Sequence, residues 1–470
     1  MADKQSRSFL ISESQYRSRG WLKSLNNHFN VSLISVMPSE RKYYEKNDIQ
    51  INKMYRLDKF VEEKIHLNIF NIVNNFEKKN HINISEFVDT DRKLKLLSDN
   101  EIIEYTAKLI TYFRKIINEN KFLFCCMEIT WFHEVILFYI CKEKGLDVFC
   151  PDRCKFSFNK FYIFKDFSRS VLLERKNKKK LKYANLIKEL SRHLPKNKNI
   201  YKYNEKEFIR LSQRNNFGFD KFRLLIILIF RKMNGGFYHY IHRNLSWYLF
   251  NKIECMIRKK LLTYFYRFDK VDLTKTKYVY IPLHVQPESG IDLVGRRYSN
   301  QIEFIKKCSL SLPAGYKIIT KDHPHDFGRK TANFYKQIQS FYNCKVVSTK
   351  TSVHDIISNA SLVITIVGTA SLEALLMKVP SLSAVKMYYS KLCVQEKFEP
   401  ENEYLTDILN KTKNWKKYRN SSRFKKDLCD IYSNRYDGNV GPIDMNQDIL
   451  KKDNMKKIYQ VFEELCNVKN

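Results

Sequence analysis

The second half of the chain alternates apolar runs with amphipathic stretches, and this alternation limits the fold more than any other feature. The runs with the pattern of buried strands are Tyr278–Leu283, Tyr316–Thr320, Cys344–Ser348, Leu362–Val367 and Ser381–Val385. The stretches with helical periodicity between them are Asn300–Ser311, Thr331–Tyr342, Ser352–Ala360 and Thr369–Lys378. Such alternation predicts an α/β fold with a parallel, doubly wound sheet. We therefore expect residues 271–400 to form one Rossmann-like lobe.

The first half of the chain is less regular but contains one similar unit. Lys121–Met127 and Leu146–Cys150 have the pattern of strands, and Phe132–Lys144 between them has the pattern of a helix. A chain of 470 residues also exceeds the ~100–200 residues of an ordinary domain. We predict a second Rossmann-like lobe in residues 1–270, with a basic, aromatic helical insertion at about 174–269. The two lobes are expected to face a cleft, and residues 401–470 to form helices that pack across both.

The charge of the chain is strongly positive, with 84 Lys and Arg against 50 Asp and Glu, a net +34. This charge would attract nucleic acid, anionic lipid or an acidic substrate, and part of it is what AT-rich codon usage alone would produce. No nucleic-acid-binding motif stands out, so we expect no nucleic-acid partner.

Targeting and cysteine patterns point to the cytoplasm. The N-terminal residues lack the apolar core of a secretory signal, and the longest apolar run, Leu224–Phe230, is too short to span a membrane. The 11 cysteines include no CxxC pair, so we expect reduced thiols without disulfides or zinc.

The loop after the second strand of the C-terminal lobe carries Lys321, Asp322, His323 and Pro324. Ligands of doubly wound sheets bind beyond the carboxyl ends of the strands, so this position favours a binding role. A histidine here can donate a hydrogen bond to a phosphate, and Lys321 can add positive charge. An ordinary strand-ending turn remains the alternative.

A small-residue segment, Gly368-Thr369-Ala370-Ser371-Leu372-Glu373, follows the apolar strand and opens a helix. Free backbone N–H groups and hydroxyls at a helix start can bind a phosphate. Glu373 is then available to sugar hydroxyls. The alternative is that Thr369 only caps the helix.

A third polar loop follows the first strand of this lobe and carries His284, Gln286, Glu288 and Ser289. Alone it resembles any surface loop. Because the three loops occupy matching topological positions, we predict that they converge on one anionic ligand.

The block PLHVQPESGIDLVGRRYSNQIEFI, then KDHP, then ITIVGTASLEALLMKVPSLS resembles the capsule polysaccharide biosynthesis family, which includes GT-B-fold Kdo transferases of capsule assembly. The resemblance implies metal-independent transfer of a sugar from a nucleotide, often CMP, to a glycan or lipid-linked acceptor, with no cofactor beyond this co-substrate. Carried over, the residues that contact the nucleotide are His323, Pro324, Gly368, Thr369, Ser371 and Glu373. Asp322 departs from the family pattern, which often has Glu or Pro there.

The catalytic group is expected on the N-terminal lobe, where Glu128 ends an apolar strand and His133 and Glu134 open the next helix. A carboxylate there can deprotonate an acceptor hydroxyl. Helix capping is the alternative for each acidic residue, because the helix dipole favours Glu near a helix start. Asp152 is a weaker candidate.

Two further segments leave alternatives open. The triplet Asp89-Thr90-Asp91 resembles a metal-binding motif, but helix capping explains it better and we expect no metal. The basic, aromatic stretch Phe222–Phe268 fits a membrane-surface segment and internal helices equally well. Rival functions are a CDP-glycerol-type glycerophosphotransferase and a non-catalytic polysaccharide-assembly or membrane scaffold.

Overall fold

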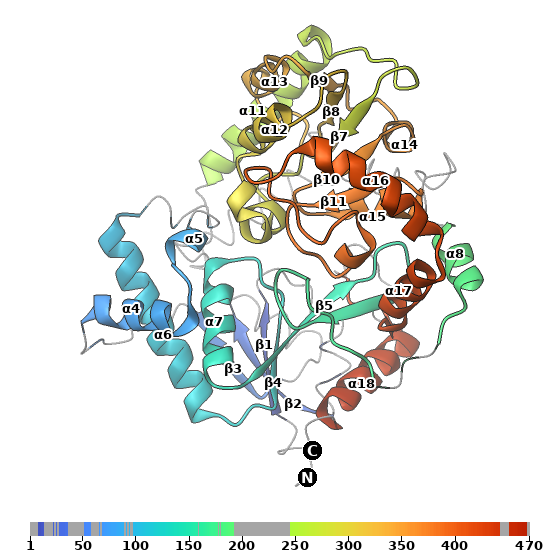
Figure 1. Cartoon of the computed structure of the whole chain (residues 1–470). Helices are drawn as coiled ribbons and strands as arrows, with labels where there is room; N and C mark the ends of the chain where they lie inside the picture. The colour runs from blue at the N-terminus through green and yellow to red at the C-terminus, as the bar shows by residue number, and fades with distance from the viewer. Residues whose placement is uncertain are drawn as a thin grey trace. The chain divides into compact units, whose positions relative to one another are not determined.

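The computed structural model describes residues 8–13, 22, 25, 28–35, 51–57, 65, 68–88, 91, 94, 97–157, 159–176, 178, 180–191, 245–441 and 451–467. These residues form two compact units (Figure 1). Unit 1 contains the described residues up to Lys176 and from Asn434 onward, and unit 2 contains those from 178 to 433.

Unit 1 is built on a seven-stranded sheet of order β12-β6-β5-β4-β1-β2-β3. Its strands are β1 (Ser8–Glu13), β2 (Asn30–Ser35), β3 (Lys53–Arg56), β4 (Phe124–Met127), β5 (Asp147–Arg153), β6 (Lys160–Phe164) and β12 (Tyr436–Asp437). The first five pair in parallel, whereas β6 is antiparallel to both β5 and β12. The parallel part has the order 3-2-1-4-5 of a Rossmann half.

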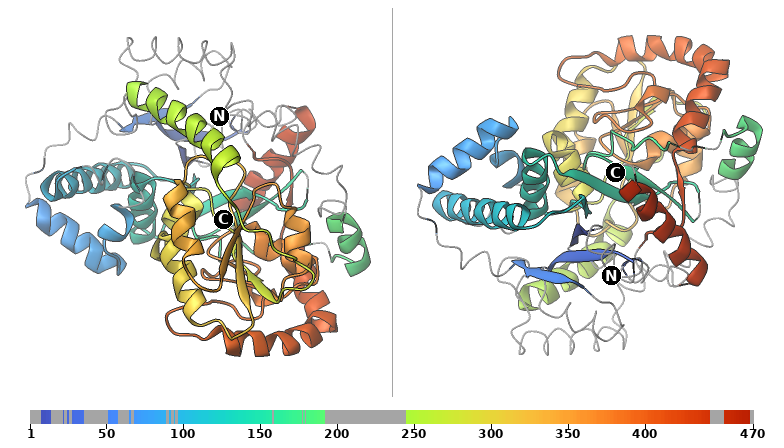
Figure 2. Two further views of the ribbon diagram at one scale, coloured as in Figure 1. Left: turned by 90° about the horizontal axis from the view of Figure 1, so that it is seen from above. Right: turned by 90° about the horizontal axis from the view of Figure 1, so that it is seen from below.

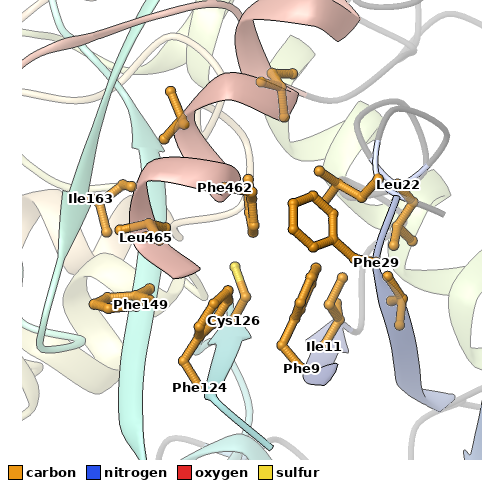
Figure 3. Close-up of a cluster of buried hydrophobic side chains, with 14 of the residues drawn as sticks. Phe9, Ile11, Leu22, Phe29, Phe124, Cys126, Phe149, Ile163, Phe462 and Leu465 are labelled. Carbon is orange, nitrogen blue, oxygen red and sulfur yellow. The ribbon is translucent and has the colours of Figure 1, made fainter. Parts of the chain in front are cut away.

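Aromatic side chains fill the core of unit 1 beneath the central strands (Figure 3). Phe9 of β1 stacks on Phe124 of β4 with ring centroids 4.8 Å apart, and Phe462 lies 5.5 Å from Phe9. Phe462 belongs to α18 (Lys452–Asn467), which therefore packs on this sheet. Since all three rings are almost fully buried, the last helix helps to complete the core of the unit in which the chain begins.

The helices of unit 1 whose bounds lie in the described part of the chain are α4 (Ile69–Asn80), α5 (Ser85–Val88), α6 (Asp99–Glu119), α7 (Phe132–Glu143) and α18. α4 and α6 lie side by side in both views of Figure 2. Buried Glu143 of α7 joins them: its carboxylate accepts from Asn80 Nδ2 of α4 at 2.7 Å and from Arg114 Nη2 of α6 at 3.0 Å. This charged link fixes α7, which follows β4, against its neighbours.

Unit 2 is built on a five-stranded, fully parallel sheet of order β11-β10-β7-β8-β9. Its strands are β7 (Tyr278–Tyr280), β8 (Lys317–Lys321), β9 (Cys344–Val347), β10 (Leu362–Thr365) and β11 (Ser381–Ser383). The helices between them are α12 (Gln301–Leu310), α13 (Ala332–Gln339), α14 (Val353–Ser358) and α15 (Thr369–Leu376). Every predicted strand and helix of this region is present, and the α/β class is confirmed. In chain order this sheet too is 3-2-1-4-5, so both units are Rossmann-like.

Further helices of unit 2 come from both sides of the sheet region in the sequence. Those in the described residues are α8 (Tyr183–Ser191), α11 (Leu245–Phe265), α16 (Leu405–Asn420) and α17 (Ser422–Ser433), with short turns η3 (Gly290–Val294), η4 (Arg296–Tyr298) and η5 (Ser390–Leu392). The predicted C-terminal helical region is thus divided, because α16 and α17 belong to unit 2 and α18 to unit 1. Of the predicted insertion, residues 192–244 lie outside the described part of the chain.

Candidate functional site

The strand order of unit 2 reverses between β7 and β10, its first and fourth strands. In doubly wound sheets a ligand binds beyond the carboxyl ends of the strands at this reversal. Residues 281–290 follow β7, residues 366–368 follow β10, and residues 322–330 follow β8, which is the other neighbour of β7. The topology therefore brings the three predicted loops to one edge of the sheet.

His284 links the loop after β7 to the end of β10. Its Nε2 accepts a hydrogen bond from the backbone N–H of Ile366 at 3.3 Å. Burial, together with the positive charges of Lys330 and His323, lowers the pKa of His284 to about 3, so the ring is neutral near pH 7. A neutral ring that accepts at Nε2 carries its proton on Nδ1. His284 thus has one N–H left to donate.

That N–H lies beside Gly368, where α15 begins. A Cβ added at Gly368 would lie 3.8 Å from Nδ1 of His284. Gly368 has φ +133° and ψ −171°, a conformation that only glycine adopts readily, and it provides no side-chain cap for α15. Tyr389 holds this turn by donating from its hydroxyl to the Gly368 carbonyl at 2.6 Å. The first N–H groups of α15 therefore start next to a neutral imidazole donor.

The loop after β8 presents His323. Its backbone N–H donates to Asp322 Oδ1 at 2.8 Å, and its Nδ1 accepts from the His325 N–H at 3.2 Å. His323 is exposed as a residue, and the centroid of its ring lies 5.1 Å from that of His325. Partial burial, with the charges of His325, Lys330 and Lys321, lowers the pKa of His323. Pro324 follows in a turn closed by the bond from Asp326 N–H to the His323 carbonyl, 2.8 Å long.

A buried ion cluster joins this loop to the loop after β7. Lys330 Nζ donates to the carboxylates of Asp322 and Asp326 and, at 3.0 Å, to the carbonyl of His284. Asp326 also accepts from the Gln286 N–H at 3.3 Å, and Asp322 accepts from the Tyr335 hydroxyl at 2.5 Å. Sequence reasoning missed this cluster, although Asp322, Asp326 and Lys330 follow one another at four-residue intervals. Asp322, where the sequence departs from the family pattern, is therefore a buried residue that fixes this loop through Lys330 and Tyr335.

Gln301 at the start of α12 is a second connector that the sequence did not reveal. Its side chain accepts from the His284 N–H at 2.7 Å and donates to Gln286 Oε1 at 2.9 Å. Gln286 Nε2 in turn donates to Asp292 at 2.8 Å. Both ends of the Gln286 side chain are therefore hydrogen-bonded within the protein, and its predicted binding role stays a prediction.

Two more predicted side chains are engaged elsewhere. Lys321 is buried and its Nζ donates to the Thr351 carbonyl at 2.7 Å, and desolvation lowers its pKa to about 8. Ser371 is fully buried, with its hydroxyl bonded to Ser381 at 3.0 Å. Lys321 thus ties β8 to the loop after β9, and Ser371 can offer a ligand only its backbone N–H.

Glu373, Thr369, Glu288 and Ser289 remain near the same edge. Gly368 is the capping position and Thr369 the first helical residue, which corrects the alternative in which Thr369 caps α15. Burial raises the pKa of Glu373 to about 7, against the lowering effect of a hydrogen bond with Thr369. Glu288 is exposed and Ser289 half-buried at the start of η3.

The carboxylate candidates of unit 1 separate clearly. Glu128 lies directly after β4 and is half-buried. Glu134 is fully buried and its Oε2 accepts from the backbone N–H groups of Thr130 and Trp131 at 2.6 and 3.0 Å, so it caps α7. His133 is fully buried, and desolvation lowers its pKa to about 3. The predicted catalytic roles of His133 and Glu134 therefore lack an accessible group, and Glu128 remains.

Asp152 pairs with Arg169 at 3.1 Å. Asp89 and Thr90 lie outside the described residues, and Asp91 accepts from the Leu94 N–H at 3.3 Å, as a cap would. Within the described residues no His, Cys, Asp or Glu cluster has the form of a metal site.

All eleven cysteines are described, and none forms a disulfide. Of the helices that the structure describes, none is long and apolar enough to cross a membrane.

No protein-family model matches the sequence, nor does any curated protein. Several solved structures match over most of both chains at low identity. A beta Kdo 2,7 transferase from Thermosulfurimonas dismutans is 10% identical, with 99% of this chain and 100% of that chain covered and a TM-score of 0.36. A UDP-GlcNAc 2-epimerase from Methanocaldococcus jannaschii is 12% identical, with 89% and 94% covered and a TM-score of 0.24. An Anabaena protein in complex with UDP-glucose is 10% identical, with 98% and 99% covered and a TM-score of 0.26. At these scores the function has to follow from the chemistry of the site itself.

Proposed function

We propose that unit 2 binds the phosphate of a nucleotide sugar and that the chain is a GT-B-type glycosyltransferase of bacterial surface-polysaccharide synthesis. One observation carries the proposal. At the switch point of a Rossmann-ordered sheet, neutral His284 has a free Nδ1–H beside Gly368, where α15 starts without a side-chain cap. A neutral donor and a helix N-terminus at one point suit an anion, and a nucleotide phosphate is the anion this topology usually binds.

The bound phosphate accepts hydrogen bonds from Nδ1–H of His284 and from the first N–H groups of α15. His323, on the neighbouring loop, reaches the same edge of the sheet and is exposed. Glu373 offers its carboxyl group to a sugar hydroxyl. Lys330 and Gln301 fix the backbone of the loop after β7, because Lys330 donates to the His284 carbonyl and Gln301 accepts from the His284 N–H.

The reaction is displacement at the anomeric carbon. The acceptor hydroxyl oxygen forms a bond to this carbon while the bond from the carbon to the phosphate oxygen breaks, and the electron pair leaves with the nucleotide. The donors around the phosphate stabilise the charge that develops on the leaving oxygen. Glu128 of unit 1 takes the proton of the acceptor hydroxyl.

The resemblance in the sequence makes CMP-Kdo or a related CMP-sugar the first donor to test, and a glycan or lipid-linked glycan the first acceptor. A thermal-shift screen of CMP, UDP, CDP and GDP selects the nucleotide. A preference for CMP supports this donor, and a preference for UDP or GDP redirects the proposal to another nucleotide sugar.

Calorimetry on variants tests the site directly. His284→Ala removes a hydrogen bond to a charged group, worth about 1.5–3 kcal/mol, so the Kd should rise about ten- to a hundredfold. His323→Ala should weaken binding as well, with the melting temperature nearly unchanged because His323 is exposed. His81→Asn in unit 1 is the control, since asparagine tolerates its left-handed backbone. Unaltered affinity in both site variants refutes the assignment.

Product analysis separates the rival functions. Incubation with CMP-Kdo, CDP-glycerol and UDP-sugars distinguishes sugar transfer from glycerophosphate transfer. A scaffold without chemistry binds the nucleotide but gives no product with any of them, and Glu128→Gln then changes nothing.

A further inference from the structure

Helix α11 exposes a continuous apolar stripe. Six of the twelve exposed large apolar side chains of the described residues lie on it, so this helix concentrates the exposed apolar surface. They are 45–79% exposed and are Phe250, Ile253, Ile257, Leu261, Tyr264 and Phe265. Their spacing of three and four residues places them on one side of the helix. Exposed apolar stripes of this length mark interaction surfaces.

Another side of α11 is fixed to unit 2. Gly328 approaches it so closely that an added Cβ would lie 2.7 Å from the Cys255 carbonyl. Arg258 donates to the carbonyl of Arg329 at 2.7 Å, and Leu262 is 2% exposed. The helix is therefore held on the loop that carries His323, and its apolar stripe is not needed for that packing.

The charges around the stripe are positive. Between Phe250 and Phe268 the chain has five Lys or Arg residues and one acidic residue, Glu254, which pairs with Arg258. Lys260 and Arg267 are exposed. An apolar stripe with aromatic residues, next to unneutralised basic side chains, is typical of helices that lie in the interface of an anionic membrane.

We propose that α11, the long yellow-green helix of Figure 2, docks on an anionic lipid surface with its axis in the plane of the membrane. Basic residues contact lipid phosphates and the apolar stripe enters the acyl boundary. The helix is not long and apolar enough to cross the membrane. The proposal does not depend on the proposed function. If both hold, the helix that supports the His323 loop also brings the enzyme to lipid-linked acceptors.

Vesicle sedimentation of the full chain tests the docking. We expect binding to vesicles of phosphatidylglycerol and phosphatidylcholine, and much weaker binding to phosphatidylcholine alone. The triple variant Ile253→Ser, Ile257→Ser, Leu261→Ser should lower the partition coefficient tenfold or more. The matched control is Leu310→Ser, Tyr342→Ser, Tyr404→Ser, which removes three exposed apolar side chains elsewhere in unit 2 and should leave binding unchanged.

The charges are tested separately. Lys260→Gln with Arg267→Gln should lower binding to anionic vesicles roughly fivefold per residue, the effect of about 1 kcal/mol for each basic residue near an anionic surface. Raising the salt concentration should also lower binding to anionic vesicles, because salt screens the attraction between the basic residues and the lipid phosphates.

Two outcomes overturn the proposal. If the serine variant changes the oligomeric state in light scattering while no vesicle binding occurs, the stripe is an interface between copies of the chain. If it lowers the melting temperature by several degrees without vesicle binding, the stripe is covered by the chain itself. Loss of vesicle binding with retained nucleotide affinity supports docking, independently of the outcome at His284.

Discussion

β4 of unit 1 and β10 of unit 2 are followed by the same kind of connection: a buried parallel strand leads through a short loop into an apolar helix. The two helix starts differ. At α7 the carboxylate of Glu134 accepts the N–H groups of Thr130 and Trp131. At α15 the cap is Gly368, which has no side chain to accept anything.

The difference shows how one topology serves two purposes. An anion at a helix start is favourable because the N–H groups there lack partners and the helix dipole is positive. Unit 1 supplies that anion from its own sequence, whereas α15 of unit 2 has no acidic residue in its first turn and has His284 beside its cap, as the proposed binding of a phosphate requires. Glu134 is the third helical residue of α7 and caps its own helix, whereas α15 has neither an acidic residue in its first turn nor a side chain at its cap, Gly368.

The two carboxylates of unit 1 give the largest expected effect. Glu128→Gln should reduce kcat/KM for sugar transfer by about 10²–10⁴, the usual contribution of a general base, with little change in melting temperature. Glu134→Gln should leave kcat nearly unchanged and lower the free energy of unfolding by about 1–2 kcal/mol, because the cap of α7 is weakened. Steady-state kinetics and urea unfolding measure the two effects. The reverse pattern would make Glu134 the catalytic group and remove the contrast between the helix starts.

The contrast between Glu128 and Glu134 also shows what the sequence alone could not decide. Both are glutamates near a helix start, and the sequence allowed capping or catalysis for each. Only the geometry, with Oε2 of Glu134 on two backbone N–H groups, separates them. The sheet of unit 2 was predictable because its short, mostly apolar strand segments alternate regularly with helical segments.

β1 was missed for a related reason. Its six residues, Ser8–Glu13, lie in a polar N-terminal segment, and they pair with β2 on one side and, on the other, with β4, which comes more than a hundred residues later in the chain. The cluster of Lys330 with Asp322 and Asp326 was missed because charged residues in a loop are usually exposed, whereas these are paired and buried.

Placing a carboxylate in the first turn of α15 is the most direct test of the comparison between the two helix starts. Ala370→Asp places a carboxylate in the first turn of α15, where the dipole favours it, and should stabilise the protein slightly, by about 0.3–1 kcal/mol. The same charge repels a nucleotide phosphate, so the Kd should rise about a hundredfold in calorimetry. Ala370→Asn, of nearly equal size without the charge, should change affinity much less. Equal affinity of the Asp variant and the wild type would place the anion elsewhere.

A change of the turn itself should have a smaller effect. Gly368→Ala forces a side chain into a glycine-only conformation and should cost about 1–3 kcal/mol of folding stability, with weaker nucleotide binding because the turn must shift next to His284. Gly315→Ala is the matched control, since Gly315 also has positive φ, at +82°, but no neighbour within 4 Å. It should lower the melting temperature and leave nucleotide affinity unchanged. Equal losses of affinity in both variants would mean that stability, not the turn, controls binding.

The smallest expected effect concerns Glu373 and the pH. Burial raises its pKa from 4.5 to about 7, so between these values the folded chain holds a proton that the unfolded chain has lost. Stability contributed by this group is complete below pH 4.5 and is lost as the pH rises towards 7. Glu373→Gln removes the titration, so the variant should gain on the wild type between pH 4.5 and 7.5 by about 1 kcal/mol, less than the full value of the shift because Glu373 is only half-buried and solvent screens its charge. Urea unfolding at several pH values measures the difference. A constant difference would mean that the carboxyl of Glu373 is solvated and that burial does not raise its pKa.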